Sequence, residues 1–435
     1  MKFSEAQPEF LFTVWEGGGA IPPALGTARR LLGTGARVRV MSDACNREEV
    51  ERQGLEFIAW SRATSRPNKS PDTDPIRDWE ITQPLQIIDR LCERLIFGPA
   101  VAYAQDTLDE VARRPADVVV TSELLFGPMM AAEVAGCKLA LLTANLWLYP
   151  TLRGVPPAGP GFAPATCEAE RERDLEVRRT TTGVFDAYLP VLNRARKTLS
   201  LAPLNSIFDQ LNRADCTLLG TSAAFDFSVE ELPESFHYVG PQLDEPGWVD
   251  AWESPWPAAD SRPLVLVAFS TTFQNQGTTL QRVIDALTSL PVRGVVTLGE
   301  GFDGTGVRCT EKVVVRRSAP HDELMQRASL VVTHGGHGTV MRALSAGVPM
   351  LCLPMGRDQR DNAARVTIRG AGLMLEPSAS TNEIASAVEQ LLSAPAFRLA
   401  SGKLGTRIRA ESDGKLAAQT LYALARRSLL TPTTH

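Results

Sequence analysis

Residues 330–354 decide the fold, and they read Leu330-Val-Val-Thr-His-Gly-Gly-His-Gly-Thr-Val-Met-Arg-Ala-Leu-Ser-Ala-Gly-Val-Pro-Met-Leu-Cys-Leu-Pro354. The mostly apolar residues 330–333 predict a buried strand, and the glycines that follow predict a tight turn. An amphipathic helix is expected over 339–346, and a second strand over 350–354. Strand, turn, helix and strand in this order form a parallel βαβ unit.

The same alternation of strands and helices extends through the whole chain. In the first half, strands are predicted at 10–15, 37–41, 116–121, 138–143, 216–220 and 238–240, with helices at 24–32 and 128–135. In the second half, further strands are predicted at 264–269, 294–298 and 312–316, with helices at 279–290, 360–369, 383–392 and 404–424. Two doubly wound, Rossmann-like α/β domains that face each other across a cleft are therefore expected.

The length of the chain also favours two domains, because 435 residues are too many for one ordinary hydrophobic core. Residues 241–263 hold five prolines and three tryptophans, which is typical of a linker. We expect an N-terminal domain over 1–240 and a C-terminal domain over 264–410. A final helix over 411–435 is expected to pack back on the N-terminal domain.

Composition excludes several classes of protein. The net charge of −5 argues against nucleic acid as a partner, because phosphate backbones attract basic surfaces. No apolar run approaches the roughly 20 residues that span a bilayer, so integral membrane contact is not expected. The first residues carry no apolar signal core, and the seven cysteines are never paired as CxxC. These features predict a cytoplasmic protein with reduced thiols.

The glycine turn of the opening segment is a candidate anion site. Glycines at a strand end let the backbone approach a ligand, and a helix start presents unpaired N–H groups at the positive end of its dipole. Such a site suits a pyrophosphate. The residues of the turn that would contact the phosphates are His334, Gly335, Gly336, His337, Gly338 and Thr339. The alternative is a purely structural turn capped by the threonine.

Two further segments support the ligand-binding interpretation. Asp358 and Gln359 stand at a strand-to-helix turn, where a carboxylate and an amide can hydrogen bond to the vicinal hydroxyls of a sugar. Thr271 and Thr272 follow the predicted strand 264–269, where a doubly wound fold opens its crevice, and their hydroxyls can face the same phosphate.

Together these segments resemble the donor-binding half of glycosyltransferase family 1, whose members use nucleotide sugars and have the GT-B fold. The matching residues are Ala319-Pro-His321, His334-Gly-Gly-His-Gly-Thr339, Ala346-Gly-Val-Pro349, and Asp358-Gln359 with Asn362-Ala363. The resemblance covers about residues 313–372, and by it the C-terminal domain over 264–410 would bind the nucleotide-sugar donor and the N-terminal domain over 1–240 the acceptor. It implies that His334 and Thr339 contact the diphosphate, that Asp358 and Gln359 contact the sugar, and that the segment from Ser318 to His321 contacts the nucleobase. Plant members place a tryptophan where Ser318 stands.

The N-terminal half departs from the pattern of the family. Family members carry a general-base histidine in the loop after the first strand, oriented by an aspartate after a later strand. Here Ala20 occupies the histidine position and Ser122 the aspartate position, and no histidine occurs before His237. Three solutions stay open. Glu16 or Glu123 acts as the base, the acceptor is acidic enough to need little help, or the protein binds a nucleotide sugar without transferring it.

We therefore predict an inverting hexosyltransferase of the bacterial natural-product type that is metal-independent. It would move a sugar from a UDP- or TDP-sugar, its co-substrate, to a small, largely apolar acceptor, with no other cofactor and as a monomer or homodimer. Two alternatives are an epimerase or hydrolase of the same fold and a non-catalytic nucleotide-sugar-binding protein. The sugar, the nucleobase and the O-, N- or C-linkage are not determined by the sequence.

Overall fold

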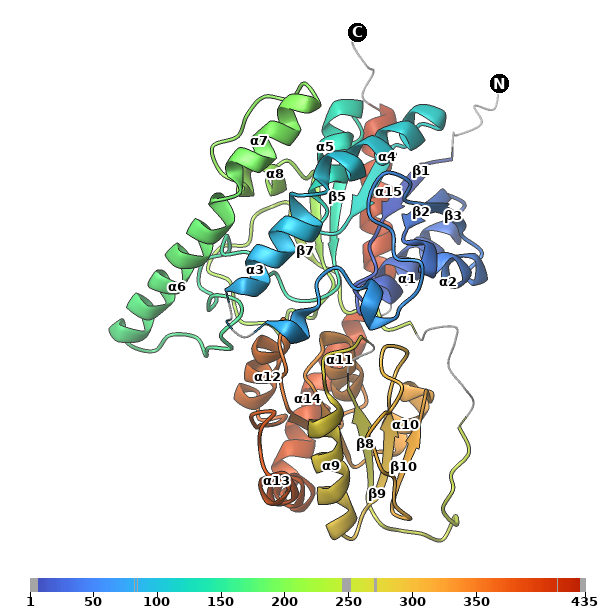
Figure 1. Cartoon of the computed structure of the whole chain (residues 1–435), viewed down its shortest axis with the longest axis vertical. Helices are drawn as coiled ribbons and strands as arrows, with labels where there is room; N and C mark the ends of the chain where they lie inside the picture. Colours follow the sequence, from blue (N-terminus) through green and yellow to red (C-terminus); the bar gives the residue numbers. More distant parts are fainter. Residues whose placement is uncertain are drawn as a thin grey trace.

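The computed structural model describes residues 7–81, 83, 85–244, 252–269, 272–412 and 414–430, the last four of them without side chains. It has two domains, each built on one parallel sheet with helices on both faces (Figure 1). The prediction of two doubly wound domains is confirmed. Within the described residues, no helix has both the length and the apolar character needed to cross a membrane.

The first domain holds a seven-stranded sheet in the order β3-β2-β1-β4-β5-β6-β7. Its strands are β1 (Glu9–Thr13), β2 (Arg37–Ser42), β3 (Glu56–Ala59), β4 (Val118–Thr121), β5 (Lys138–Thr143), β6 (Cys216–Leu219) and β7 (Phe236–Tyr238). Its helices are α1 (Ile21–Leu32), α2 (Arg47–Arg52), α3 (Gln86–Leu91), α4 (Ala100–Arg113), α5 (Phe126–Ala135), α6 (Glu168–Asp186), α7 (Leu189–Thr198) and α8 (Phe208–Leu211). Two prolines lie in the first turn of α1, where their missing N–H groups need no partner.

The second domain holds a six-stranded sheet in the order β10-β9-β8-β11-β12-β13. Its strands are β8 (Leu264–Ala268), β9 (Arg293–Thr297), β10 (Val313–Arg316), β11 (Leu330–Thr333), β12 (Met350–Cys352) and β13 (Gly372–Met374). Its helices are α9 (Gly277–Ser289), α10 (His321–Arg327), α11 (His337–Ser345), α12 (Gln359–Ile368), α13 (Thr381–Ser393) and α14 (Pro395–Glu411).

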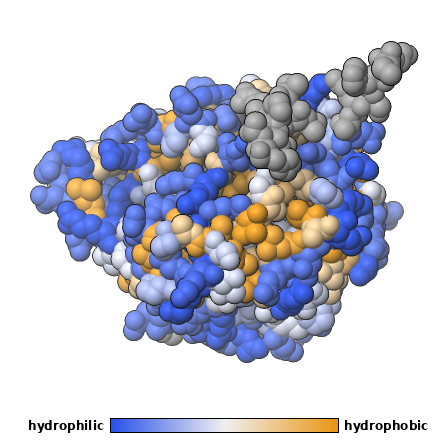
Figure 2. Space-filling view, turned by 90° about the horizontal axis from the view of Figure 1, so that it is seen from above, coloured by the Kyte–Doolittle hydropathy of each residue, from blue (hydrophilic) through white to orange (hydrophobic). Residues whose placement is uncertain are grey.

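Alternating side chains of each central strand belong to different cores. In β1, Phe10 and Phe12 lie in the core beneath α1, whereas Leu11 lies in the core on the opposite face. In β8, Leu266 and Val267 face opposite cores in the same way. Strands buried on both faces appear in the sequence as continuous apolar runs, which is why they were predictable. The face of the first domain shown in Figure 2 is largely hydrophilic, with a band of hydrophobic residues across its middle.

The C-terminal segment differs from the prediction of one helix over 404–424. The chain forms two helices, α14 and α15 (Lys415–Leu430), because Gly414 between them has a φ of 66°. Glycine adopts this left-handed conformation without strain, whereas another residue would be strained and would place a Cβ 2.4 Å from the guanidinium carbon of Arg30. Helix α15 then packs on the first domain, in the same core as Phe10 (Figure 1).

The segment predicted as a linker is held between the two domains where it leaves β7. The carboxylate of Asp244 pairs with Arg29 and Arg30 of α1, each at 2.7 Å, and its carbonyl accepts a hydrogen bond from Arg342 of α11. Trp252 and Trp256 pack against a core of the second domain. Residues 245–251, which include Trp248, lie outside the described residues.

We expect Leu421→Ala in α15 to lower the free energy of unfolding by about 2–5 kcal/mol, because this fully buried leucine would leave a cavity against the first domain. Leu416→Ala on the same helix is the matched control, because Leu416 is 47% exposed and its loss should cost less than about 0.5 kcal/mol. Urea unfolding of both variants measures the difference. If Leu421→Ala lowered the free energy of unfolding as little as Leu416→Ala, α15 would contribute little to the stability of the first domain.

Candidate active site between the two domains

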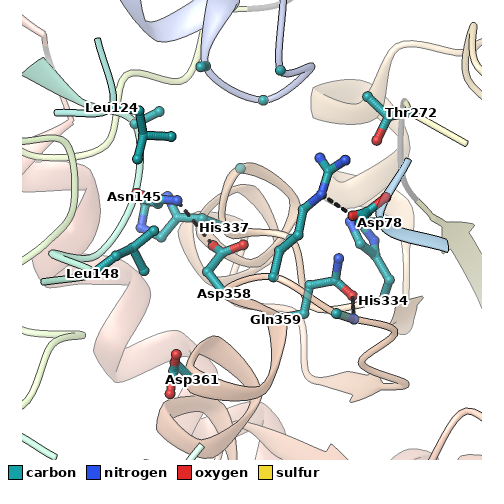
Figure 3. Close-up of a pocket in the computed structure, with 18 of the residues that line it drawn as sticks. Asp78, Leu124, Asn145, Leu148, Thr272, His334, His337, Asp358, Gln359 and Asp361 are labelled. Carbon is teal, nitrogen blue, oxygen red and sulfur yellow. Dashed lines mark hydrogen bonds and ion pairs between the residues drawn. The ribbon is translucent and has the colours of Figure 1, made fainter. Parts of the chain in front are cut away.

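A cavity of about 1040 Å³ lies between the domains, and residues that follow strands of both sheets line it. Trp15 comes after β1, Glu123 after β4, and His334 directly after β11. In doubly wound folds the crevice beyond the carboxyl ends of the strands is where ligands bind. This cavity, part of which Figure 3 shows, is therefore the candidate site.

The glycine turn predicted as an anion site forms the floor of the cavity on the second domain. Gly335 has a φ of 91°, and a Cβ there would lie 2.9 Å from the carbonyl oxygen of Gln359. A Cβ on Gly336 would lie 2.5 Å from Nε2 of His334, so both positions require glycine. Helix α11 begins directly afterwards, has no acidic residue in its first turn, and presents Gly338 and Thr339 to the cavity. Its unpaired N–H groups suit a negatively charged ligand.

His334 is a neutral side chain at this turn. Its ring is buried and stacks against Phe269, with ring centroids 6.2 Å apart and an angle of 26° between the planes. Burial lowers the pKa of His334 to about 4, although a hydrogen bond with the backbone of Ala268 favours the charged form. The imidazole therefore offers hydrogen bonds to a ligand near pH 7, and not a full positive charge.

His337 lines the cavity, but its imidazole contacts the first domain. Its Nε2 lies 2.9 Å from the hydroxyl of Thr221, which follows β6. Burial lowers the pKa of His337 to about 3, so this contact joins two neutral groups. In the structure Nε2 of this imidazole is therefore already engaged across the domain interface. The expected contact of the imidazole with a phosphate stays a prediction.

The two residues predicted to bind the sugar differ in their surroundings. The carboxylate of Asp358 lines the cavity, accepts hydrogen bonds from Asn362 at 2.8 Å and from Asn145 of the first domain at 3.4 Å, and has a pKa raised by burial (Figure 3). Gln359 also lines the cavity, but its amide is used within the second domain. It accepts from the backbone N–H groups of Met355 and Gly356 and donates to Gln274 at 3.1 Å. The side chain of Gln359 thus shapes the loop before α12.

The residues predicted to contact the nucleobase are part of the cavity wall on the second domain. Ser318 and His321 both line it, and Nε2 of His321 lies 3.0 Å from the hydroxyl of Thr297. Burial lowers the pKa of His321 to about 4, helped by the charge of Arg342. Thr272 also lines the cavity, whereas Thr271 lies outside the described residues.

The positions of the absent histidine and aspartate face the same cavity. Ala20 precedes α1 and Ser122 follows β4, and both line the site. Of the two predicted alternative bases, only Glu123 lines it. The carboxylate of Glu16 turns into its own loop, where it accepts the backbone N–H of Gly18 at 2.8 Å.

Glu123 is a carboxyl group with an unusual pKa. Burial raises its pKa to about 7, and the negative charge of Asp358 acts in the same direction. Ser122 donates a hydrogen bond to its carboxylate at 3.1 Å, which favours the charged form. A carboxyl group with a pKa near the working pH can accept a proton in a reaction and release it afterwards.

The part of the cavity within the first domain is mainly apolar. It is lined by Ile76, Trp79, Ile81, Leu85, Ile87, Ile88, Leu91, Ile96, Leu124, Leu148, Tyr149, Val177 and Phe185. Of the two aromatic residues that follow β5, Tyr149 belongs to this wall, whereas the ring of Trp147 packs in the core against Phe236. The wall suits a ligand with a large apolar surface.

An ion pair across the cleft was missed by reasoning from the sequence. Nε of Arg357 lies 2.5 Å from the carboxylate of Asp78, and both residues line the cavity (Figure 3). Beside this pair, Trp79 of the first domain packs edge-on against Phe273 of the second, with centroids 5.1 Å apart. Asp78 carries no signal in the sequence, because its partner is 279 positions away.

Comparison with known proteins agrees with this geometry. Residues 281–424 match the family model of the erythromycin biosynthesis protein CIII-like C-terminal domain. The 4'-demethylrebeccamycin synthase of Lentzea aerocolonigenes is 26% identical over 89% of this chain and 92% of its own length. The demethyllactenocin mycarosyltransferase of Streptomyces fradiae is 23% identical over 95% of this chain and 86% of its own length. The chain is a glycosyltransferase, and its sequence is similar to glycosyltransferases of the family 1 type.

Solved structures show the same GT-B fold for this glycosyltransferase. The glycosyltransferase of kitacinnamycin superposes with a TM-score of 0.73 and 20% identity, over 96% of this chain and 99% of that one. The glycosyltransferase VinC, solved in complex with dTDP, superposes with a TM-score of 0.66 and 19% identity, over 96% of this chain and 99% of that one. The relatives also identify this glycosyltransferase as one of the natural-product type.

Proposed function

We propose that this glycosyltransferase moves a sugar from a UDP- or TDP-sugar to a largely apolar acceptor, with inversion at the anomeric carbon. One observation carries the proposal. A single cavity joins a helix N-terminus suited to a diphosphate in the second domain to a carboxyl group and an apolar wall in the first. A donor and an acceptor held on these two sides would meet in the middle of the cavity.

For the donor, the proposed diphosphate site is the start of α11 with Thr339 and His334. Developing negative charge on a leaving diphosphate is stabilised by preorganised N–H groups that need no rearrangement. The sugar would then lie near Asp358, and the nucleobase near Ser318 and His321, all of which line the same cavity. The complex of VinC with dTDP supports a nucleoside diphosphate as the ligand.

For the acceptor, the proposed general base is Glu123. It lies on the first domain, across the cavity from α11, so it can take a proton from a nucleophile that attacks opposite the leaving diphosphate. This arrangement supports a single displacement with inversion. The apolar wall beside Glu123 supports an acceptor with a large hydrophobic surface.

The proposal is tested by incubating the enzyme with UDP-glucose or TDP-glucose and a panel of apolar alcohols and phenols that includes 4-methylumbelliferone. We expect a glycoside by mass spectrometry, and NMR of its anomeric proton should show inversion. Donor alone should stay largely unchanged. Free sugar or an epimer from donor alone would indicate a hydrolase or epimerase, and nucleotide binding without any product would indicate a binding protein.

His334→Ala should weaken the binding of TDP by about 10- to 100-fold, because a hydrogen bond to a charged phosphate is lost. Isothermal titration calorimetry measures the affinity, and circular dichroism checks that the fold is intact. His237→Ala is the matched control, because His237 is exposed on β7. Wild-type affinity in the His334 variant would contradict the proposed diphosphate site.

Glu123→Gln should lower kcat about 10²- to 10⁴-fold, because an amide cannot accept the proton, while TDP affinity stays within twofold. Since the base acts as a carboxylate and its pKa is about 7, wild-type kcat/KM should fall as the pH drops below about 7. The variant should lose this dependence. Rates over pH 5–9 test both points.

Glu16→Gln provides the comparison, because the carboxylate of Glu16 does not line the cavity. It should keep the pH dependence of the wild type, whatever its effect on stability. A Glu123 variant with full kcat towards an alcohol acceptor would rule out Glu123 as the base. Full kcat towards phenols alone would indicate that an acidic acceptor needs no base.

A further inference from the structure

The loop between β5 and α6 forms a wall of the acceptor side of the cavity. Leu148 and Tyr149 line the cavity near the beginning of this loop, and Ala158, Gly159 and Pro160 line it further along. The loop belongs to the first domain. Its position therefore decides the shape of the space that an acceptor would occupy.

A residue of the second domain holds this loop. The carboxylate of Asp361 in α12 accepts hydrogen bonds from the backbone N–H groups of Gly159 at 2.6 Å and Gly161 at 3.0 Å. Both glycines have positive φ values, 108° and 72°, and a Cβ on Gly161 would lie 2.8 Å from the carbonyl oxygen of Arg360. The backbone of the loop thus approaches α12 at a distance that only glycine allows.

The same helical turn holds the start of the loop. Asp358, three positions before Asp361, accepts a hydrogen bond from Asn145, and residues three apart lie on one face of a helix (Figure 3). Asn362 in turn donates to the carbonyl of Gly335 in the anion-binding turn at 3.0 Å. One turn of α12 therefore contacts the proposed diphosphate site and both ends of the loop segment 145–161.

Holding the loop with the carboxylate of Asp361 carries a desolvation cost. Its side chain is almost fully buried, and burial raises its pKa to about 6, against the effect of the two N–H groups and of Arg365. A buried carboxylate is tolerated only where several hydrogen bonds satisfy it, and these bonds are directional. The contact therefore fixes the position of the loop more precisely than apolar packing would.

We propose that Asp361 is a positioning residue for acceptor binding, which holds the wall formed by residues 158–160 in place from the donor-binding domain. This inference rests on the proposed function. With the loop held in this way, the acceptor site is complete only while α12 and the loop are in contact. A nucleotide bound at the turn against α12 stabilises that contact, so donor and acceptor strengthen the binding of each other.

Hydrogen exchange of the full-length protein tests the proposal without any acceptor. The segment 155–162 contains three prolines, so it reports on five amides, and two of these are the N–H groups held by Asp361. In the wild type, TDP should slow the exchange of this segment by about tenfold. In Asp361→Asn, exchange should be at least about tenfold faster than in the wild type without ligand, and TDP should not slow it.

Calorimetry and acceptor kinetics complete the test. TDP affinity of Asp361→Asn should stay within about threefold of the wild type, while KM for the acceptor found in the transfer assay rises about tenfold or more and kcat changes less. Asp285→Asn on the exposed side of α9 is the matched control and should change neither exchange nor KM. Gly161→Ala, which moves the loop instead of the carboxylate, should reproduce the effect if Asp361→Asn does not fold.

The outcomes separate the two proposals. Wild-type exchange of segment 155–162 in both variants would overturn the role of Asp361, even if the enzyme transfers sugar normally. Failure of the wild type to bind TDP would overturn the proposed function instead. The ligand-free comparison of exchange rates would still decide whether Asp361 holds the loop.

Discussion

The cleft depends on polar contacts that the first turns of α12 make with the opposite domain. Asp358 and Asp361 reach the loop after β5, and one turn further Arg365 forms a buried pair with Asp226 at 2.7 Å. Apolar surfaces would slide against each other, because hydrophobic contact has little directional preference. Hydrogen bonds to buried charges fix the register of the two domains, and so they set the distance between the glycine turn before α11 and Glu123.

The electrostatics of the cavity follow from desolvation more than from nearby charges. Burial keeps the imidazoles of His321, His334 and His337 neutral and shifts the pKa of Glu123 towards neutrality. A neutral imidazole beside a helix N-terminus offers directional hydrogen bonds without drawing in competing anions strongly. Arg357, the cation of the cavity wall next to Asp358 in the chain, is already paired with Asp78.

The proposed use of a carboxyl group in place of a histidine–aspartate dyad has a physical consequence. A histidine in the position of Ala20 would have a pKa near neutrality without help. A carboxyl group needs burial to reach the same range, and Glu123 obtains it from the surroundings of β4 and from the charge of Asp358 on the other domain. The proton affinity of the proposed base is thus tied to the closed arrangement of the two domains, which a histidine would not require.

The sequence determined the local features of this protein. Continuous apolar runs marked the strands, glycines with positive φ marked the turn at 335, and the order of residues 333–363 marked the donor half, because each of these depends on neighbours in the chain. It predicted one helix where Gly414, with a φ of 66°, divides two. Only the tertiary structure decided between Glu16 and Glu123 as cavity residues, turned the amide of Gln359 inward, and brought Asp78 to Arg357 and Gly159 to Asp361. These outcomes depend on burial and on contacts between residues up to 279 positions apart, and no local pattern encodes either.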